Sequence, residues 1–373
     1  MNCNCWVEIN LDRIRDNIKQ IKNILPKETK LLIVVKADGY GHGAIEVSKV
    51  AILSGANYLA VANCQEAIAL REAKIITPIL VLGIVFPQDI LKVIKYGLTL
   101  AIYQLKTAQS LSYWAEKYNQ KAKVHIKVDS GMGRLGILPH ETLDFVKKLK
   151  ELPFVEIEGI YTHLATADEE DDTYALGQFN KFKKILKTLE KEGISIPLKH
   201  ILNSAGFLRF PSMCLDLVRI GIMAYGLYPS SYCREKISLK PAMCFKTRIL
   251  QIKNLPKDSG ISYGKTYITS QETKLAVLPV GYNDGYNRLL SDKGRVIIKD
   301  KILPLRGRIC MDMCMVEISE LKKVREGEEV ILFGDNEFQS ISVDEIAKIC
   351  HSINYEIVCQ VGKSVPRVHI SSS

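Results

Sequence analysis

The chain has 373 residues, of which 47% are hydrophobic and 25% charged, with a formal net charge of +10. Because single hydrophobic cores stop growing at roughly 250 to 300 residues, this length predicts two domains. Lys and Arg are interleaved with Asp and Glu, which argues against nucleic acid as a partner. The longest apolar run, residues 75–86, falls short of the roughly 20 residues that span a bilayer, so no membrane segment is expected.

The ten cysteines are scattered, and the N-terminal sequence MNCNCWVEIN lacks the apolar core of a signal peptide. A reducing, cytoplasmic location is therefore expected. The close pairs Cys3/Cys5 and Cys310/Cys314 have no second pair at the spacing of a zinc site, which favours free thiols and no bound metal.

Near the N-terminus, the sequence CWVEINLDRIRDN predicts a short strand followed by an amphipathic helix. Leu11, Ile14, Ile18 and Ile21 fall on one face of that helix. The strand precedes the first regular repeat, so residues 1–10 are expected to pair with the sheet of the C-terminal domain.

Between residues 31 and 226, short β-branched runs alternate with helical patterns, as in βα units on a parallel sheet. The runs occupy residues 31–37, 57–63, 78–83, 98–103, 123–129, 157–165, 199–205 and 217–226. Eight near-regular repeats favour an α/β fold with a TIM-type (β/α)8 barrel over residues 11–230. An open doubly wound sheet is the alternative, because periodicity predicts strands without predicting closure.

After residue 230 the pattern changes to strand-like segments separated by turns, such as CFKTRILQI, KLAVLPV, GRVIIKD and EVILFG. One short helix, SVDEIAKIC, begins with the capping pair Ser342 and Glu345. Residues 231–373 are therefore expected to form a second, mostly β domain.

Reactive side chains fall at the carboxyl ends of the predicted barrel strands, where the active site of such a barrel lies. They are Lys36, Lys127, Asp129, His163, Asn203, Ser204 and Arg219. Lys36 precedes the turn-rich ADGYGHG, so its amine is expected to project from a hydrophobic wall. Burial there would lower the pKa of the lysine and supply the neutral amine that attacks a carbonyl group. By itself, such a lysine would more simply extend to solvent.

The loops after the last two strands of a barrel commonly bind phosphate. NSAG and RIGI occupy those places, with the Ser204 hydroxyl and the N–H groups of Gly221 and Ile222 as donors. Either motif alone is compatible with an ordinary turn. A lysine opposite a phosphate cradle suggests pyridoxal 5'-phosphate as the cofactor.

Arg219 stands within a predicted strand, where a buried guanidinium is costly unless it is paired. Facing the pyridine nitrogen of that cofactor, Arg219 could only donate a hydrogen bond, and the nitrogen would stay unprotonated. The ring is then a weaker electron sink, which suits racemisation better than transamination or decarboxylation.

Nine ordered motifs resemble those of the alanine racemase family almost from end to end. They are VVKADGYGHGA, KVDSGMGRLG, GIYTHLATAD, NSAG, VRIGIMAYGLYPS, SYGKTY, LPVGYNDGYNR, GRICMDMCMVEI and INYEIVCQVGKSVPR. The resemblance implies an isomerase that interconverts L-alanine and D-alanine with pyridoxal phosphate and supplies D-alanine for peptidoglycan.

Carried over to matching positions, the resemblance implies two bases: Lys36, which also holds the cofactor, on the D side and Tyr263 on the L side. It implies cofactor contacts from Tyr40, His163, Asn203, Ser204, Arg219, Gly221, Ile222 and Tyr355. It implies substrate contacts from Arg134, Tyr282, Asp312 and the backbone N–H of Met311. Lys127 matches a lysine that is carbamylated in many members and orients the arginine.

The resemblance also implies a head-to-tail homodimer, in which Tyr263 and Met311 reach the barrel of the partner subunit. Three alternatives stay open: a racemase for serine or larger amino acids, a pyridoxal-phosphate decarboxylase of similar architecture, and a non-catalytic carrier of the cofactor. A decarboxylase would favour an acid in place of Arg219, and the carriers consist of the barrel alone.

Overall fold

The computed structural model describes residues 3–372, apart from the side chains of residues 234 and 235. Residues 1, 2 and 373, which belong to the two expected terminal segments, lie outside this description. The chain divides into two compact units. The barrel unit contains residues 13–39 and 44–240, and the β unit contains the N-terminal residues up to Asp12, residues 40–43 and the chain from Pro241 onward.

The barrel unit is built on eight parallel strands in the order β8-β7-β6-β5-β4-β3-β2-β9. They are β2 (Lys30–Val34), β3 (Tyr58–Val61), β4 (Ile79–Val81), β5 (Thr99–Ile102), β6 (Ala122–Lys127), β7 (Val155–Tyr161), β8 (Leu198–His200) and β9 (Leu217–Ile220). The N–H of Asp216 donates to the Lys199 carbonyl at 3.1 Å, and that of Arg219 donates to the Leu202 carbonyl at 3.0 Å. These bonds join the two end strands, so the expected (β/α)8 barrel is confirmed.

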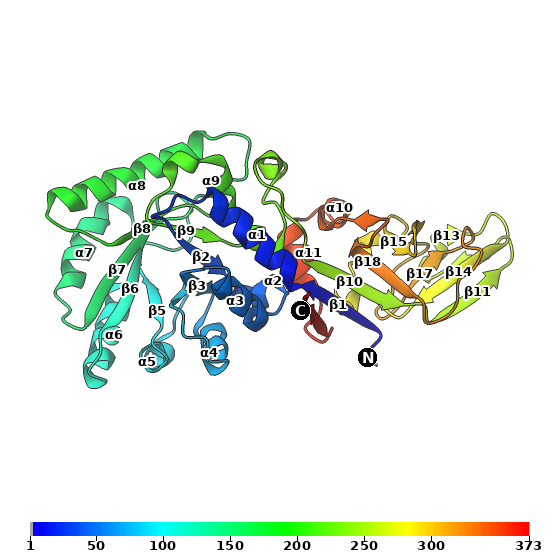
Figure 1. Ribbon diagram of the computed structural model, residues 1–373, viewed down its shortest axis with the longest axis horizontal. Coiled ribbons are helices and arrows are strands. Elements are labelled where there is room, and N and C mark those ends of the chain that lie inside the picture. The colour runs from blue at the N-terminus through cyan, green and yellow to red at the C-terminus, as the bar shows by residue number, and fades with distance from the viewer. Residues whose placement is uncertain (1–2, 373) are drawn as a thin grey trace. The chain divides into compact units, whose positions relative to one another are not determined.

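Helices surround the strands of this unit, as Figure 1 shows. They are α3 (Ala44–Leu53), α4 (Cys64–Glu72), α5 (Ile90–Lys95), α6 (Leu105–Lys117), α7 (Thr142–Lys150), α8 (Thr173–Lys191) and α9 (Ser204–Arg209). Every residue of β3, β4 and β5 is buried, as expected for strands covered on both faces. Helix α1 (Leu11–Ile24) buries Ile14, Ile18 and Ile21, which the apolar period predicted.

The β unit contains a large mixed sheet in the order β16-β15-β18-β10-β1-β20. Its strands are β1 (Cys5–Asn10), β10 (Met243–Arg248), β15 (Arg295–Ile298), β16 (Lys301–Pro304), β18 (Glu329–Asp335) and β20 (Arg367–Ile370), and β19 (Ser340–Ile341) pairs with β18. The N-terminal strand β1 therefore lies inside this sheet, antiparallel to β10 and parallel to β20.

Two smaller sheets and two helices complete the β unit. They are β11 (Gln251–Leu255) with β14 (Thr273–Leu278) and β17 (Cys314–Glu317), β12 (Gly260–Ile261) with β13 (Tyr267–Ile268), α10 (Val343–Ile349) and α11 (Asn354–Gln360). The Ser342 side chain accepts a hydrogen bond from the Glu345 N–H at 3.1 Å and caps α10, as its sequence predicted. Helix α11 was not expected.

The barrel unit continues past residue 230, where the sequence pattern placed its end. The Lys236 ammonium donates to the Leu208 carbonyl at 2.9 Å, and the Lys240 N–H donates to Asn17 Oδ1 at 2.8 Å. These contacts hold the segment against the barrel helices. The strand-like pattern could not reveal them because they depend on residues distant in sequence.

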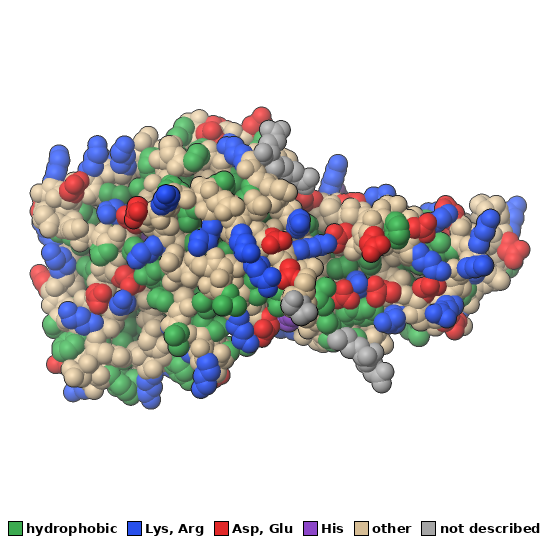
Figure 2. Space-filling view, in the orientation of Figure 1, with side chains coloured by type: hydrophobic (Ala, Val, Ile, Leu, Met, Phe, Trp, Pro, Cys, Tyr) green, Lys and Arg blue, Asp and Glu red, His purple; other side chains and the backbone are tan. Residues whose placement is uncertain are grey.

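Charged side chains of both signs are interspersed over the visible face of the molecule (Figure 2). Within residues 3–372, no helix combines the length and the apolar composition needed to cross a bilayer. In the same described part of the chain, no three His, Cys, Asp or Glu side chains are grouped in a way that could hold a metal ion.

Candidate active site

Lys36 follows β2 in a left-handed turn, α2 (Lys36–Tyr40), rather than ending the strand as the apolar pattern suggested. The φ angles of Ala37, Asp38 and Tyr40 are 52°, 53° and 53°. Such backbone costs an L-residue roughly 1 to 2 kcal/mol, so the surroundings must stabilise it. The predicted strand was too long because the apolar pattern depends on side-chain polarity and contains no information on the sign of φ.

Side chains of the barrel unit brace this turn. The N–H of Ala37 donates to Glu66 Oε1 at 2.9 Å, and the N–H of Ala44 donates to Asp38 Oδ1 at 2.8 Å. Glu66 also accepts from the Ala62 N–H at 2.7 Å, which fixes the carboxylate on the neighbouring strand connection. The half-buried Lys36 is thereby held on a rigid support at the carboxyl end of β2.

Arg219 on β9 is 3% exposed and is held by four acceptors. Its Nη1 contacts His200 Nδ1 at 2.9 Å, and its Nη2 contacts His163 Nδ1 at 3.1 Å and the carbonyls of Thr162 and Ile201 at 3.0 and 3.1 Å. Burial lowers the pKa of Arg219 to about 10, which leaves it charged at neutral pH. No described residue accepts from its Nε–H, so this donor is available to a ligand.

His163 and Lys127 lie near this guanidinium. Burial, assisted by the charge of Arg219, holds the pKa of His163 well below its usual value, so the ring is neutral and can accept from Arg219. Lys127, at the end of β6, is 7% exposed. Burial and then the positive charge of Arg134 lower the pKa of Lys127 to about 8, which gives a neutral fraction of its amine near neutral pH.

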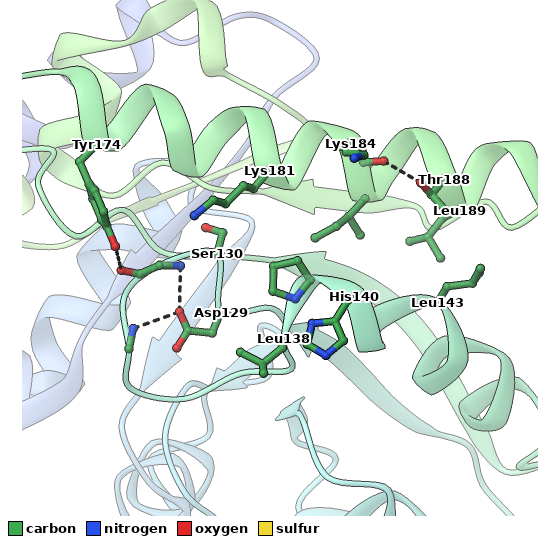
Figure 3. A pocket seen from close by; sticks show the side chains of 14 residues that line it. Asp129, Ser130, Leu138, His140, Leu143, Tyr174, Lys181, Lys184, Thr188 and Leu189 are labelled. Carbon is green, nitrogen blue, oxygen red and sulfur yellow. Dashed lines mark hydrogen bonds between the residues drawn. The ribbon is translucent and has the colours of Figure 1, made fainter.

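The loop after β6 is organised by Asp129 (Figure 3). Its carboxylate accepts from the N–H groups of Gly131, Gly133 and Arg134 at 3.0, 3.1 and 3.0 Å. Burial would raise the pKa of Asp129, but these backbone bonds outweigh it and lower the pKa. The carboxylate thus shapes the loop that carries Arg134.

A groove of about 800 Å³ runs beside this loop, between α8 and the segment around His140 (Figure 3). Tyr174 closes one end by donating from its hydroxyl to the Gly131 carbonyl at 2.7 Å. The lining includes Asp129, Lys181 and Thr188 but none of the residues expected to contact cofactor or substrate. The groove is therefore separate from the predicted site.

The two turns expected to bind phosphate lie side by side in the barrel unit. Ser204 begins α9, and its Oγ accepts from the Gly221 N–H at 2.9 Å in a buried position. That N–H was expected to be open to phosphate, so the donors left at this point are the Ser204 hydroxyl and the backbone of Ile222. The Asn203 side chain accepts from the Gly206 N–H at 2.9 Å and acts as the N-cap of α9.

Tyr40 and Tyr355, also expected at the phosphate, both belong to the β unit. Their ring centroids are 6.1 Å apart and their planes are inclined by 53°. Gly41 is needed beside Tyr40, because a Cβ there would lie 2.4 Å from the Val358 carbonyl oxygen. Burial raises the pKa of Tyr40, so its hydroxyl keeps its proton and can donate.

Three more of the predicted residues line an exposed groove of about 630 Å³ in the β unit. Tyr263, Met311 and Asp312 share this groove, and Tyr263 is 71% exposed. Ser262, with φ of 62°, sets the turn before Tyr263 and donates from Oγ to the Arg308 carbonyl at 2.6 Å. No described residue accepts from the Met311 N–H, consistent with a donor open to a carboxylate.

Tyr282 is tied to the same groove by its backbone. Its N–H donates to the Cys310 carbonyl at 3.1 Å, and the next N–H, of Asn283, donates to the Met311 carbonyl at 3.0 Å. Gly281 permits this close approach, because a Cβ there would lie 2.2 Å from the Met311 carbonyl oxygen. The structure thus divides the predicted residues between the two units, with Lys36, Lys127 and Arg219 in the barrel unit and Tyr263, Met311 and Asp312 at one groove of the β unit.

The sequence reasoning missed a group of buried polar side chains behind Arg219. His200 accepts from Arg219, and its ring stacks on Tyr161 with centroids 4.7 Å apart and planes 9° apart. His125 and Glu158 continue the contacts from His200. The available signal was a polar residue inside each β-branched run, where a barrel strand must bury it.

The barrel unit carries a lysine, an arginine that can only donate and a serine-lined turn at the carboxyl ends of its strands. The β unit carries a groove with an exposed tyrosine. Together these features define an enzyme of the (β/α)8-barrel class. The family model for the alanine racemase N-terminal domain matches residues 9–229, and that for the C-terminal domain matches residues 242–369. The chain therefore belongs to the alanine racemase family.

Individual relatives agree with this assignment. Alanine racemase of Halothermothrix orenii is 48% identical over 97% of this chain and 96% of its own, and that of Methanococcus maripaludis is 45% identical over 98% of each. The structure of Clostridium difficile alanine racemase superposes with a TM-score of 0.95 at 40% identity over 100% of this chain and 97% of that one. The Bacillus anthracis alanine racemase with bound L-Ala-P gives 0.92 at 38% identity over 99% and 96%. The expected racemase function is confirmed.

Proposed function

We propose that this chain interconverts L-alanine and D-alanine with Lys36 and Tyr263 as the two bases and pyridoxal phosphate as the cofactor. When bound, pyridoxal phosphate withdraws electrons from the substrate α-carbon and so acidifies its proton. Cytoplasmic supply of D-alanine for peptidoglycan is part of the proposal and rests on the family resemblance.

Arg219 is the single observation that carries the cofactor assignment. It is a buried cation that can only donate, its Nη1 and Nη2 are held by protein acceptors, and within residues 3–372 its Nε–H has no partner. An unprotonated pyridine nitrogen is an acceptor that fits such a donor. The Ser204 hydroxyl and the Tyr40 hydroxyl, which keeps its proton, would hold the phosphate.

Racemisation needs one base on each face of the substrate α-carbon. Lys36 would move the proton on the D side, supported by the braced turn α2. Tyr263 would move the proton on the L side. Arg134 and the Met311 N–H would bind the substrate carboxylate, with Asp312 in the same groove as Met311. The backbone N–H of Tyr282 donates to Cys310, which also lines that groove.

We infer that Tyr263 serves the barrel of a second copy of this chain, which makes the enzyme a homodimer with shared sites. The support is an exposed cluster of large side chains that line the groove: Tyr263, Met311 and Met313, which are 71%, 53% and 45% exposed. A contiguous exposed apolar patch of this kind is typical of an interaction surface.

Lys127 would carry a carbamate. Its neutral amine would attack carbon dioxide, form an N–C bond and release one proton, which leaves an anionic carbamate next to Arg134. The lowered pKa of Lys127, about 8, supports this step, because an ammonium has no lone pair for it. Asp129 is already occupied by three backbone N–H groups of its own loop.

Purified protein with added cofactor should convert each alanine enantiomer into a racemic mixture, followed by the decay of optical rotation. Serine and larger amino acids, assayed in the same way, decide the breadth of the substrate range. Release of carbon dioxide without loss of optical activity in the remaining alanine would favour the decarboxylase alternative and contradict the proposal.

A further inference from the structure

A continuous chain of buried hydrogen bonds runs behind Arg219 through the interior of the barrel. Arg219 Nη1 contacts His200 Nδ1 at 2.9 Å, His200 Nε2 contacts His125 Nδ1 at 2.9 Å, and His125 Nε2 contacts Glu158 Oε2 at 3.1 Å. The four side chains come from the neighbouring strands β9, β8, β6 and β7 and are 3%, 0%, 0% and 8% exposed. None of them except Arg219 has a part in the proposed reaction.

The two ends of this chain fix the direction of every hydrogen bond. The Glu158 carboxylate only accepts, so His125 Nε2 must carry the hydrogen and His125 Nδ1 the lone pair. His200 Nε2 must then donate, which leaves His200 Nδ1 as an acceptor. Arg219 only donates, and so requires the same arrangement from the opposite end. Both histidines are therefore neutral and carry their proton on Nε2.

The far end of the chain is equally well determined. Lys123 donates to Glu158 Oε1 at 2.8 Å. Burial would raise the pKa of Glu158, but the bonds from His125 and Lys123 outweigh it and lower the pKa to about 2. Burial lowers the pKa values of His125 and His200. Glu158 is thus ionised while both rings are neutral.

This series of hydrogen bonds connects the buried charge of Arg219 to a counter-charge. A buried guanidinium without a counter-charge is strongly destabilised, and no carboxylate of the described residues forms an ion pair with Arg219. Glu158 is the carboxylate connected to it, by two polarised imidazoles. Hydrogen bonds in such chains strengthen one another in a low-dielectric interior.

We propose that Glu158 is a positioning residue for Arg219, acting through His125 and His200 to hold the guanidinium with its Nε–H directed to the ligand. The part that concerns the cofactor rests on the proposed function. The directions of the hydrogen bonds do not, because they follow from the protein side chains alone.

The first test measures the two imidazoles directly. Long-range ¹H–¹⁵N correlation spectra of ¹⁵N-histidine-labelled protein, assigned with His125→Gln and His200→Gln variants, should show both rings as neutral Nε2–H tautomers at neutral pH. Finding either ring as the Nδ1–H tautomer or as an imidazolium at neutral pH would overturn the proposal. This outcome does not depend on racemase activity or on bound cofactor.

The second test is a double-mutant cycle between Glu158 and Arg219, which are not in contact. Glu158→Gln should raise the half-saturating pyridoxal phosphate concentration about tenfold when Arg219 is present and change it less than about twofold in an Arg219→Met background. Glu156→Gln is the matched control. Glu156 lies on the same strand, and its Oε1 is 4.0 Å from Lys123 Nζ, but it takes no part in the hydrogen bonds that lead to Arg219. It should have no effect in either background.

Equal effects of Glu158→Gln in both backgrounds would mean a merely structural role and would overturn the positioning role. Urea unfolding of each variant verifies that the fold is retained, and Glu158→Asp is carried through the same cycle should Glu158→Gln not fold. If wild-type protein binds no pyridoxal phosphate, the proposed function fails, and the same cycle on the unfolding midpoint still decides whether Glu158 and Arg219 are coupled.

Discussion

The two groups of predicted site residues differ in how this chain holds them. In the barrel unit, Arg219 and Lys127 are buried and surrounded by fixed acceptors and charges. In the β unit, Tyr263 and Met311 are largely exposed on the wall of an open groove. Buried groups act in a low dielectric and are already oriented, whereas exposed side chains acquire both properties only when another surface covers them. Folding alone therefore builds the barrel group, and under the proposed homodimer we expect association to complete the other.

Lys36→Ala should give the largest effect and tests the barrel side of this comparison. Without the amine, both the cofactor attachment and the D-side base are lost, so racemisation should fall by at least about a thousandfold. Borohydride reduction of loaded wild-type protein should label the peptide that contains Lys36, as measured by mass spectrometry. Lys147→Ala, at an exposed lysine on α7, serves as the control. A label on another lysine would show that the barrel site is assigned wrongly.

Tyr263→Ala tests the exposed side of the comparison. The two bases serve opposite faces, so the variant should lose solvent deuterium exchange into L-alanine by roughly a hundredfold or more and keep part of the exchange into D-alanine through Lys36. Both rates are read by proton NMR in deuterium oxide. Tyr113→Ala, at another exposed tyrosine, should resemble the wild type. Equal slowing of both enantiomers, with fold and cofactor retained, contradicts the two-base assignment.

Mixing the two inactive variants sharpens the idea that association completes the site. After subunit exchange, half of the dimers are mixed, and each mixed dimer holds one intact site of two, so about a quarter of wild-type activity should return. Activity is measured before and after exchange, which native mass spectrometry verifies. If subunits exchange and no activity returns, then Lys36 and Tyr263 of one subunit form a site together, or the two residues do not share a site.

The fold was largely predictable because each of the eight barrel strands has its own local run of apolar residues. The features that could not be predicted depend on backbone geometry and on contacts between residues distant in sequence. The left-handed turn at Lys36 depends on Glu66 and Asp38, which no strand pattern includes. The bond from Gly221 to Ser204 joins two loops that the sequence placed side by side as independent phosphate donors.

The candidate site was predicted in the same uneven way. Its reactive residues were inferred from strand ends and from motifs, and their roles stay predictions. His125, His200 and Glu158 were missed, because a polar residue inside a strand run does not reveal its partner until the strands are neighbours. Tyr263 shows the opposite problem: its motif suggests a role, whereas its position in the isolated chain is an exposed groove.

The smallest expected effect concerns Lys127, whose buried amine links the barrel group to substrate binding. Its pKa of about 8 lies below the usual value, so the reactive neutral form increases as pH rises through 8 and disappears as pH falls toward 6. Carbamate occupancy should therefore rise with pH and fall as pH is lowered.

At pH 8, removing carbon dioxide should raise KM for alanine by roughly threefold to tenfold with a smaller change in kcat, because an ammonium repels Arg134 whereas a carbamate attracts it. ¹³C-bicarbonate should give a carbamate carbon signal in wild-type protein and none in Lys127→Met, whose KM should not respond to carbon dioxide. A wild-type KM equally insensitive to carbon dioxide would leave Lys127 as an unmodified buried amine.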